Sequence, residues 1–106
     1  MITVTYHRHN NEVVVKGHAN SGEKGHDLIC ASVSILVYTL ASFVENMYEA
    51  GQAPEPLILL EEGNAWIISN QKHTLKPPVT LVFDSICAGF ELLAKNYPNN
   101  ITYEIT

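Results

Sequence analysis

Positive charge is scarce in this chain. Six Lys and Arg residues stand against eleven Asp and Glu residues among 106, so the formal net charge is −5 and the pI is near 5.4. Affinity for nucleic acid comes mainly from Lys and Arg side chains that neutralise phosphates. The composition therefore excludes a general nucleic-acid-binding protein and favours partners that are themselves basic.

Cysteine is also rare. The two cysteines, Cys30 and Cys87, are not part of a CxxC motif, and we expect both to be free thiols because disulfides are uncommon in the cytosol. With 46% hydrophobic and 16% charged residues, the composition is that of a compact globular protein. Its length predicts a single domain over residues 1–106.

Long hydrophobic runs are missing as well. A membrane-spanning helix needs about 20 apolar residues. Hydroxyl side chains interrupt the most apolar stretch, 29–44, at Ser32, Ser34, Thr39 and Ser42. Residues 1–6 lack the basic and apolar regions of a secretory signal. We therefore expect a soluble, cytoplasmic protein with no membrane partner.

The first part of the chain has the pattern of a β-hairpin. Residues 2–8 alternate apolar and polar side chains, which predicts a half-buried strand, and 9–11 form a turn. Residues 12–16 predict the returning strand, which runs directly into Gly17-His18-Ala19. The aperiodic, glycine-containing segment 20–26 predicts a loop, so His18 is expected at or just past a strand end.

Two helices are expected next in the chain, separated by a second hairpin. Asp27 is a helix N-cap signal before an apolar periodic run, which predicts a helix over 28–49 that ends near Gly51. A turn at Gly63-Asn64 joins the predicted strands. The expected buried stripes are Ile29, Val33, Leu36, Leu40, Phe43, Val44 and Met47 in the first helix, and Val82, Ile86, Phe90, Leu93 and Tyr97 in the second.

The remaining boundaries complete the predicted order ββαββαβ. The second hairpin pairs 57–60 with 65–68, and a polar loop covers 69–76. Pro77-Pro78 can begin a helix but not lie inside one, which predicts a helix over 79–96, and 101–105 alternate as a final strand. This order predicts an α+β two-layer sandwich, in which a mostly antiparallel five-stranded sheet carries both helices on one face.

Cys30 and His18 are the residues most able to carry chemistry, as a nucleophile and its base. If Asp27 is the N-cap, Cys30 is the third helical residue, where free N–H groups and the positive end of the helix stabilise a thiolate and offer an oxyanion site. The Asp27 carboxylate acts in the opposite direction. Ser34 lies one turn beyond Cys30 on the same face and could bind the substrate or a catalytic partner.

Two short blocks, Gly17-His18-Ala19 and residues 27–34 (DLICASVS), together resemble the ribosomal-processing cysteine protease (Prp) family. The resemblance implies a cysteine endopeptidase that removes a short N-terminal extension from a large-subunit ribosomal protein. On that basis His18 is the general base and acid, and Cys30 is the nucleophile. Gly17, Asp27 and Ser34 are supporting or substrate-binding residues.

The same resemblance implies an architecture and a set of partners. The family has two helices on one side of a five-stranded sheet, with a cleft between the first helix and the second strand. It implies cleavage beside bulky apolar or aromatic side chains, no cofactor and no metal, and a homodimer. The partner is the N-terminal segment of the ribosomal protein, without direct contact to nucleic acid.

Other interpretations of these residues remain open at this stage. A metal site could be built from His7, His9, His18, His26 and Cys30, although their spacing matches no common zinc signature. Asp27 could be a plain N-cap, and Ser34 a helix serine bonded to a backbone carbonyl. Cys87 is expected to be a buried structural thiol. Tyr38 and Trp66 are expected in core or dimer contacts, since no basic residues accompany them for nucleic-acid stacking.

Two other functional classes compete with a peptidase. A non-catalytic protein that binds a ribosomal segment would tolerate loss of the Cys30 thiol and still bind. A thiol redox sensor would oxidise Cys30 reversibly, but it needs a resolving thiol. Cys87 is the remaining cysteine, and its expected place in a helical core argues against this role.

Overall fold

The computed structural model describes residues 1–17, 26–70 and 77–106, with the backbone alone at residues 26, 27, 77 and 78. Its elements follow the order predicted from the sequence. They are β1 (Ile2–His7), a 3-10 turn η1 (Arg8–Asn10), β2 (Glu12–Gly17), α1 (His26–Glu49), β3 (Leu57–Glu61), β4 (Asn64–Ile68), α2 (Pro77–Asn96) and β5 (Ile101–Ile105). The predicted strands and helices are therefore all present, with boundaries within two residues.

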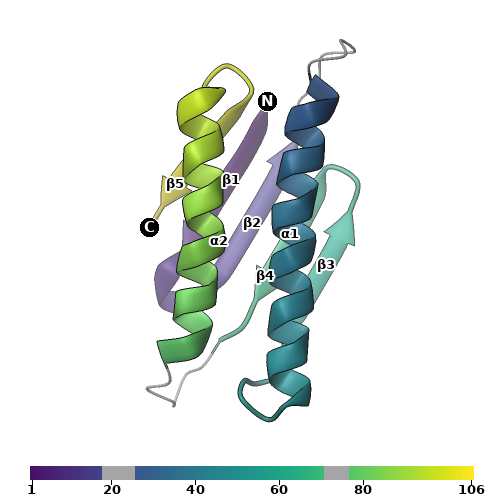
Figure 1. The fold of residues 1–106 in the computed structure, drawn as a ribbon, viewed down its shortest axis with the longest axis vertical. Helices are drawn as coiled ribbons and strands as arrows, with labels where there is room; N and C mark the ends of the chain where they lie inside the picture. Colours follow the sequence, from purple (N-terminus) through teal and green to yellow (C-terminus); the bar gives the residue numbers. More distant parts are fainter. Residues whose placement is uncertain (18–25, 71–76) are drawn as a thin grey trace.

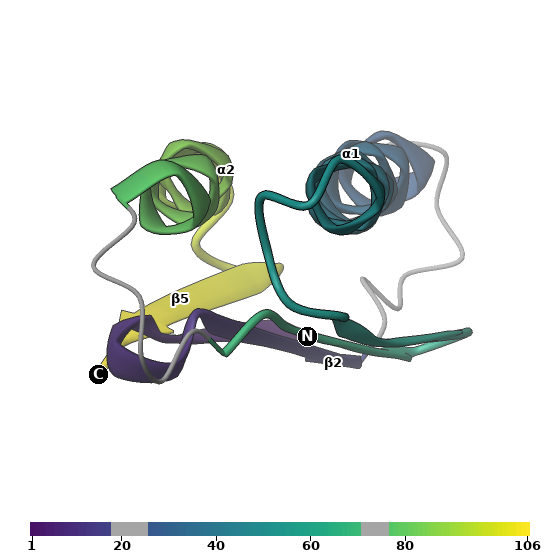
Figure 2. The same cartoon turned by 90° about the horizontal axis from the view of Figure 1, so that it is seen from below.

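The five strands form one sheet in the order β3-β4-β2-β1-β5. All neighbouring strands are antiparallel except β1 and β5, which pair in parallel with Ile2 opposite Ile101. Both helices cover one face of the sheet and leave the other face open, as Figure 2 shows. The predicted two-layer α+β sandwich is thus confirmed, and the strand order places β3 and β5 at the two edges.

The start of α1 differs from the expectation. The helix begins at His26, so Asp27 is its second residue and not its N-cap. Cys30 is consequently the fifth helical residue, in the second turn. The field of a helix end falls off within the first turn, so the helix offers Cys30 less stabilisation of a thiolate than the sequence argument assumed.

The core lies between the helices and the sheet. In α1 the predicted stripe is confirmed except at Phe43, which is exposed, and at Leu36, which is only partly buried. In α2 the buried row is Val79, Phe83, Cys87 and Phe90, whereas the predicted row, Phe90 apart, is partly buried or exposed. Two neighbouring rows of α2 are apolar, and periodicity alone does not say which of them faces the sheet.

Helix α1 is long and apolar enough to cross a membrane by length and composition alone, with a mean hydropathy of 1.9. The hydroxyl side chains that interrupt this stretch therefore do not make it too polar to meet that criterion. In this fold 33% of that apolar window is buried inside the protein. Core helices of soluble proteins meet the same criterion, and the inner face of α1 supplies buried side chains such as Leu40 and Val44 to the core of the sandwich.

Candidate active site

A cleft of about 380 Å³ lies between α1 and the end of the sheet formed by β2 and the β3–β4 hairpin. Cys30, Ser34 and Tyr38 line it from α1, Gly17 from β2, and Leu60 from β3. Other parts of its wall are Ile2, Val15, Val33, Val37, Glu61, Glu62, Gly63, Asn64 and Ala65. The cleft therefore combines an apolar floor with a few polar groups, which is typical of a ligand-binding site.

Cys30 is a free, half-buried thiol on the wall of this cleft. The adjacent residue Ile29 is buried in the core, as is Val33 one turn further along, and these anchors fix the face of α1 that carries Cys30. A cysteine acts as a nucleophile only where a substrate can reach its sulfur. The structure meets that condition for Cys30.

Gly17 brings the end of β2 to the same cleft. Its φ of +97° is a conformation that glycine adopts easily, and an added Cβ would lie 2.2 Å from the carbonyl oxygen of Met1. Its N–H donates to the carbonyl of Gly63, at 3.0 Å, and so joins β2 to the tip of the β3–β4 hairpin. No larger residue fits here, and His18 is bonded directly to it.

Ser34 is exposed and lies in the cleft one helical turn after Cys30, as the sequence predicted. The alternative, a serine that bonds back to its own helix, is seen at a different residue: Ser32 Oγ donates to the carbonyl of Leu28 at 2.7 Å. Within the described part of the chain, no hydrogen bond holds the Ser34 hydroxyl. This hydroxyl is therefore available to a ligand in the cleft.

His18 lies outside the described residues, and so does the loop predicted over 20–26 apart from His26. The side chains of His26 and Asp27 are likewise outside the description. The structure therefore brings together Gly17, Cys30 and Ser34 from the predicted site.

The metal alternative finds no cluster in the described ranges. Among those residues, no group of three or more His, Cys, Asp or Glu side chains is arranged to hold a metal ion. His7 Nδ1 instead lies 2.7 Å from Thr106 Oγ1, at the far edge of the sheet from the cleft. The described residues thus offer no metal ligand set around Cys30.

Cys87 lies in an environment opposite to that of Cys30. It is 2% exposed within α2, and burial raises the pKa of its thiol to about 12, while a hydrogen bond with Tyr103 acts in the lowering direction. A thiol with that pKa is almost entirely protonated and unreactive at neutral pH. The prediction of a buried structural cysteine is confirmed.

Sequence reasoning missed part of the cleft. Tyr38 was expected in core or dimer contacts; it is 57% exposed and so lies outside the core, and it lines the cleft two turns after Cys30. Trp66 is also exposed, on the open face of the sheet, where its Nε1 donates to Glu12. The spacing of Cys30, Ser34 and Tyr38 at intervals of four residues was the available signal, since such residues share one helix face.

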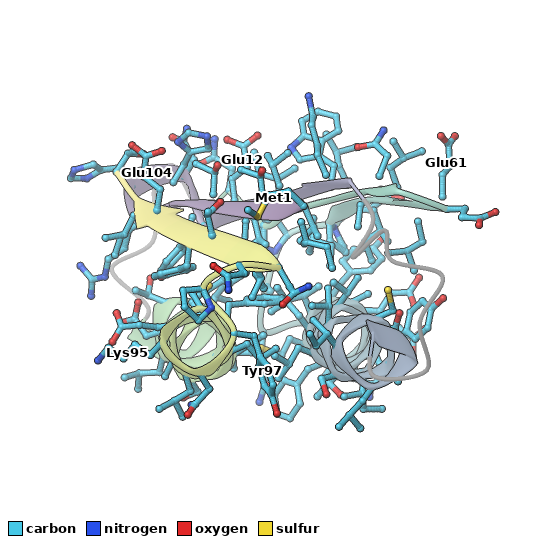
Figure 3. The ribbon with its side chains drawn as sticks, turned by 90° about the horizontal axis from the view of Figure 1, so that it is seen from above. Met1, Glu12, Glu61, Lys95, Tyr97 and Glu104 are labelled. Atoms are coloured by element: carbon cyan, nitrogen blue, oxygen red, sulfur yellow. The ribbon has the colours of Figure 1, made fainter. Side chains whose placement is uncertain are left out.

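Glu61 shows how the hairpin contributes to the cleft. Its side chain points to the open face of the sheet, away from the helices, as do those of Glu12 and Glu104 (Figure 3). Its contribution to the cleft wall is therefore its backbone. The cleft side of the hairpin presents Leu60 and main-chain groups.

Comparison with known proteins identifies the family. The family model described as "Cysteine protease Prp" matches residues 1–102. The chain belongs to the cysteine protease Prp family. The ribosomal processing cysteine protease Prp of Mycoplasma genitalium is 29% identical over 91 residues, which is 86% of this chain and 84% of that relative. The protein is therefore a cysteine protease of the ribosomal-processing family, as the sequence resemblance predicted.

Solved structures, one of them of a Prp protease, have the same fold. The essential ribosomal processing protease Prp of S. aureus, in complex with a covalently linked product peptide, superposes with a TM-score of 0.75 at 23% identity, covering 100% of both chains. SMU.848 from Streptococcus mutans has a TM-score of 0.72 at 28% identity, covering 99% of this chain and 91% of its own. These similarities confirm the α+β sandwich over the whole chain.

Proposed function

We propose that this Prp-family protease uses Cys30 as its nucleophile and His18 as its general base and acid to remove a short N-terminal extension from a large-subunit ribosomal protein. The observation that carries the proposal is the cleft itself. A cysteine protease needs a thiol and an imidazole at one cleft. Cys30 of α1, a partly buried free cysteine, lines this cleft, and so does Gly17, the last residue of β2, which is bonded to His18.

The proposed reaction proceeds in two steps. His18 takes the proton of the Cys30 thiol, and the sulfur attacks the scissile carbonyl to form a tetrahedral oxyanion. The oxyanion collapses to a thioester, the peptide C–N bond breaks, and the imidazolium returns the proton to the leaving amine. Water, deprotonated by His18, then hydrolyses the thioester and releases the extension with a free carboxylate and the thiol restored. No cofactor is required for this balance.

Several features support the assignment of substrate and roles. The S. aureus relative has been crystallised with a substrate peptide and with a covalently linked product peptide, and such a covalent link supports nucleophilic catalysis. The net charge of −5 favours encounter with basic ribosomal proteins. We assign the Ser34 hydroxyl to substrate binding and Asp27 to a supporting role at the helix start. The proposal places the protein in the cytoplasm, where free thiols such as Cys30 are usual.

The test is cleavage of a peptide that carries the N-terminal extension and the first residues of the mature ribosomal protein. Mass spectrometry is expected to find one cut with the wild type and none with Cys30→Ser or His18→Ala, a loss of at least about 10³-fold. Ser34→Ala is expected to raise KM with a smaller effect on kcat. Circular dichroism and thermal unfolding of each variant provide the fold control, and Cys87→Ser provides the matched thiol control.

Cutting by both Cys30→Ser and His18→Ala would contradict the dyad. Binding of the peptide by the wild type without any cleavage would instead favour the non-catalytic binding protein. Reversible loss of activity through a Cys30–Cys87 disulfide would favour the redox sensor.

We also propose that the protein is a homodimer, as the family resemblance implies. The outward row of α1 supports this, because Leu28, Ile35 and Phe43 expose large apolar side chains on a helix that also buries its inner face. Sedimentation is expected to give twice the mass of the chain for the wild type and a monomer for Ile35→Glu. A monomer at all concentrations of the wild type would overturn the homodimer.

A further inference from the structure

The free edge of β3 lies beside the cleft, and the hydrogen-bond register shows which of its backbone groups point outward. Ser69 N–H donates to the carbonyl of Asn11 at 2.9 Å, and Gly17 N–H to the carbonyl of Gly63 at 3.0 Å. Bonds between β2 and β4 therefore use the odd-numbered residues of β4, and its even-numbered residues bond to β3.

The outward groups of β3 follow from this alternation. Glu61, Leu59 and Leu57 stand opposite the even-numbered residues of β4 and bond to them. The N–H and C=O groups of Ile58 and Leu60 point off the edge instead. No described residue bonds to these four groups, and Leu60 is part of the cleft wall.

The segment of β3 that carries these outward groups is apolar. Residues 57–60 are Leu-Ile-Leu-Leu, with no charge and no proline, and Leu60 is 42% exposed. Proteins usually blunt an exposed edge strand with Lys, Pro or a bulge, because such an edge pairs readily with another chain. Glu61 is the charged residue of β3, but its backbone groups face β4 and its side chain points to the open face of the sheet (Figure 3). An apolar, unblunted edge beside a nucleophile is suited to binding an extended peptide by strand addition.

The spacing along α1 matches such a strand. Cys30, Ser34 and Tyr38 are four residues apart, about 6 Å per step at 1.5 Å per residue. Alternate residues of a strand face the same side and are about 6.7 Å apart. In Figure 1, α1 and β3 run in opposite directions, and residues of both line the cleft. Successive inward side chains of a peptide strand would therefore meet Cys30, Ser34 and Tyr38 in turn.

We infer that the substrate binds as an additional strand against β3, paired with the backbone of Ile58 and Leu60, and that Tyr38 selects the side chain four residues from the scissile bond. This inference rests on the proposed function, which supplies the peptide and the cut at Cys30. It deepens that function by naming an extended backbone conformation and a remote apolar subsite as what the enzyme recognises.

The decisive experiment leaves the protein unchanged. Each amide of the extension peptide is N-methylated in turn, and the affinity of the peptides for full-length Cys30→Ala is measured by fluorescence anisotropy. A strand predicts an alternation along the residues that pair with Ile58 and Leu60: a loss of affinity of about 10-fold at every second amide and little change between them. Absence of a two-residue period would overturn the strand.

A variant tests the same edge from the protein side. Leu60→Pro removes an outward N–H that the sheet does not use, and proline is tolerated at edge strands in that orientation. Its kcat/KM for the extension peptide is expected to fall about 10-fold. The matched control is Ile105→Pro at the β5 edge, which also removes an outward N–H because Thr106 N–H is the one that bonds to Tyr6. An equal effect of the two variants would overturn the assignment to β3.

Tyr38 is tested with two peptides that differ only four residues from the cut, one with Phe and one with Ala. Tyr38→Ala is expected to reduce kcat/KM about 10-fold for the Phe peptide and to leave the Ala peptide unchanged. Tyr48→Ala, which removes an exposed tyrosine of α1 outside the cleft and outside the proposed dimer row, is the matched control. Equal losses for both peptides would overturn the subsite.

Failure of the proposed function has a different signature. If the wild type does not cut the peptide, the dyad assignment fails, while the N-methyl scan of binding still decides whether a strand forms. A peptide that is neither cut nor bound would overturn the strand as well.

Discussion

The two cysteines occupy the two helices of one layer and meet opposite surroundings. Cys30 on α1 faces an open cleft, whereas Cys87 on α2 is 2% exposed, and burial raises its pKa to about 12. A cysteine side chain is therefore accessible to a substrate in one half of the molecule and is part of the hydrophobic core in the other. Access to solvent and to a substrate decides which of the two roles a thiol takes.

The surroundings of the two helices differ in the same way. On the α2 side, the Tyr6 hydroxyl donates to Asp84 at 2.8 Å, Arg8 forms a two-point ion pair with Asp84 at 3.0 Å, and Tyr6 stacks on Phe83. On the α1 side, the cleft polar groups Cys30 and Ser34 have no such fixed partners among the described residues. The polar groups on the α2 side therefore bond to one another, whereas the polar groups of the cleft on the α1 side are available to bind a ligand.

The largest expected difference between the halves is thiol reactivity. At pH 8 a pKa of about 12 leaves roughly one Cys87 in 10⁴ as thiolate, and burial also blocks access. Iodoacetamide is expected to label Cys30 of the native protein at least about 100 times faster than Cys87, and labelling of Cys30 is expected to abolish peptide cleavage. Peptide mass mapping over time measures both rates. Equal labelling rates of both thiols in the folded protein would contradict the difference in accessibility between Cys30 and Cys87.

The two glycines Gly17 and Gly89 give the next contrast. Gly17→Ala is expected to destabilise the fold by about 3 kcal/mol or more, because the positive φ alone costs about 1–3 kcal/mol and the new Cβ would collide with the Met1 carbonyl. At Gly89 an added Cβ meets only the end of the flexible Leu36 side chain, at 3.0 Å. Gly89→Ala is therefore expected to change stability by less than about 1 kcal/mol.

Denaturant unfolding measures both free energies. Peptide cleavage by Gly17→Ala is expected to fall more than its loss of folded protein explains, since Gly17 lines the cleft. Similar stabilities of the two variants would show that the Met1–Gly17 contact is not rigid.

Much of the fold could be predicted because its signals are local. The alternation in residues 2–8, the Gly51 helix end and the Pro77-Pro78 helix start each depend on neighbouring residues, and all appear close to the expected positions. The row of α2 that faces the core could not be predicted in this way. Val79 and Val82 begin two apolar rows of equal quality, and only the docking of α2 on β1 and β5 decides between them.

The site was predictable to a similar extent. Cys30 and Ser34 were expected together because they share a helix face, Gly17 was expected from the family resemblance, and the cleft contains all three. The start of α1 was misplaced because Asp27 gives the same N-cap signal whether the helix begins there or earlier. Leu60 and Tyr38 were missed as cleft residues because their meeting depends on the strand order, with β3 at the edge, which sequence periodicity does not encode.

Replacing each thiol by a hydroxyl sharpens the comparison between the halves. Cys87→Ser is expected to cost about 1–3 kcal/mol of stability, because it places a more polar group in the core, and to leave kcat/KM within about twofold. Cys30→Ser is expected to do the reverse, with stability within about 0.5 kcal/mol and no turnover. Urea unfolding measures the stability of both variants, and peptide cleavage measures their turnover. Loss of turnover in Cys87→Ser without loss of stability would contradict its structural role.

The smallest expected effect comes from Asp84. The Arg8 guanidinium, together with the Tyr6 hydroxyl, holds the pKa of the Asp84 carboxyl below its usual value of 3.8. Since a lowered folded-state pKa stabilises the protein above the unfolded value, this contribution is present at neutral pH and is lost as the pH falls through the folded value. Asp84→Asn is therefore expected to cost about 1 kcal/mol at pH 7, a modest figure because water screens a partly exposed ion pair.

The pH dependence separates this effect from a simple packing change. The difference in unfolding free energy between the wild type and Asp84→Asn is expected to shrink below pH 3.8, and peptide cleavage at pH 7 is expected to be unchanged because Asp84 does not line the cleft. Lys95→Gln, which removes an exposed ion pair with Glu91 at 3.3 Å, is the matched control. Its unfolding free energy is expected to differ little from that of the wild type at either pH. If the difference in unfolding free energy stays the same in acid, Asp84 acts through its packing and not through its charge. The contrast between the α2 side, with its charged contacts, and the α1 side, with its open cleft, would then be weaker.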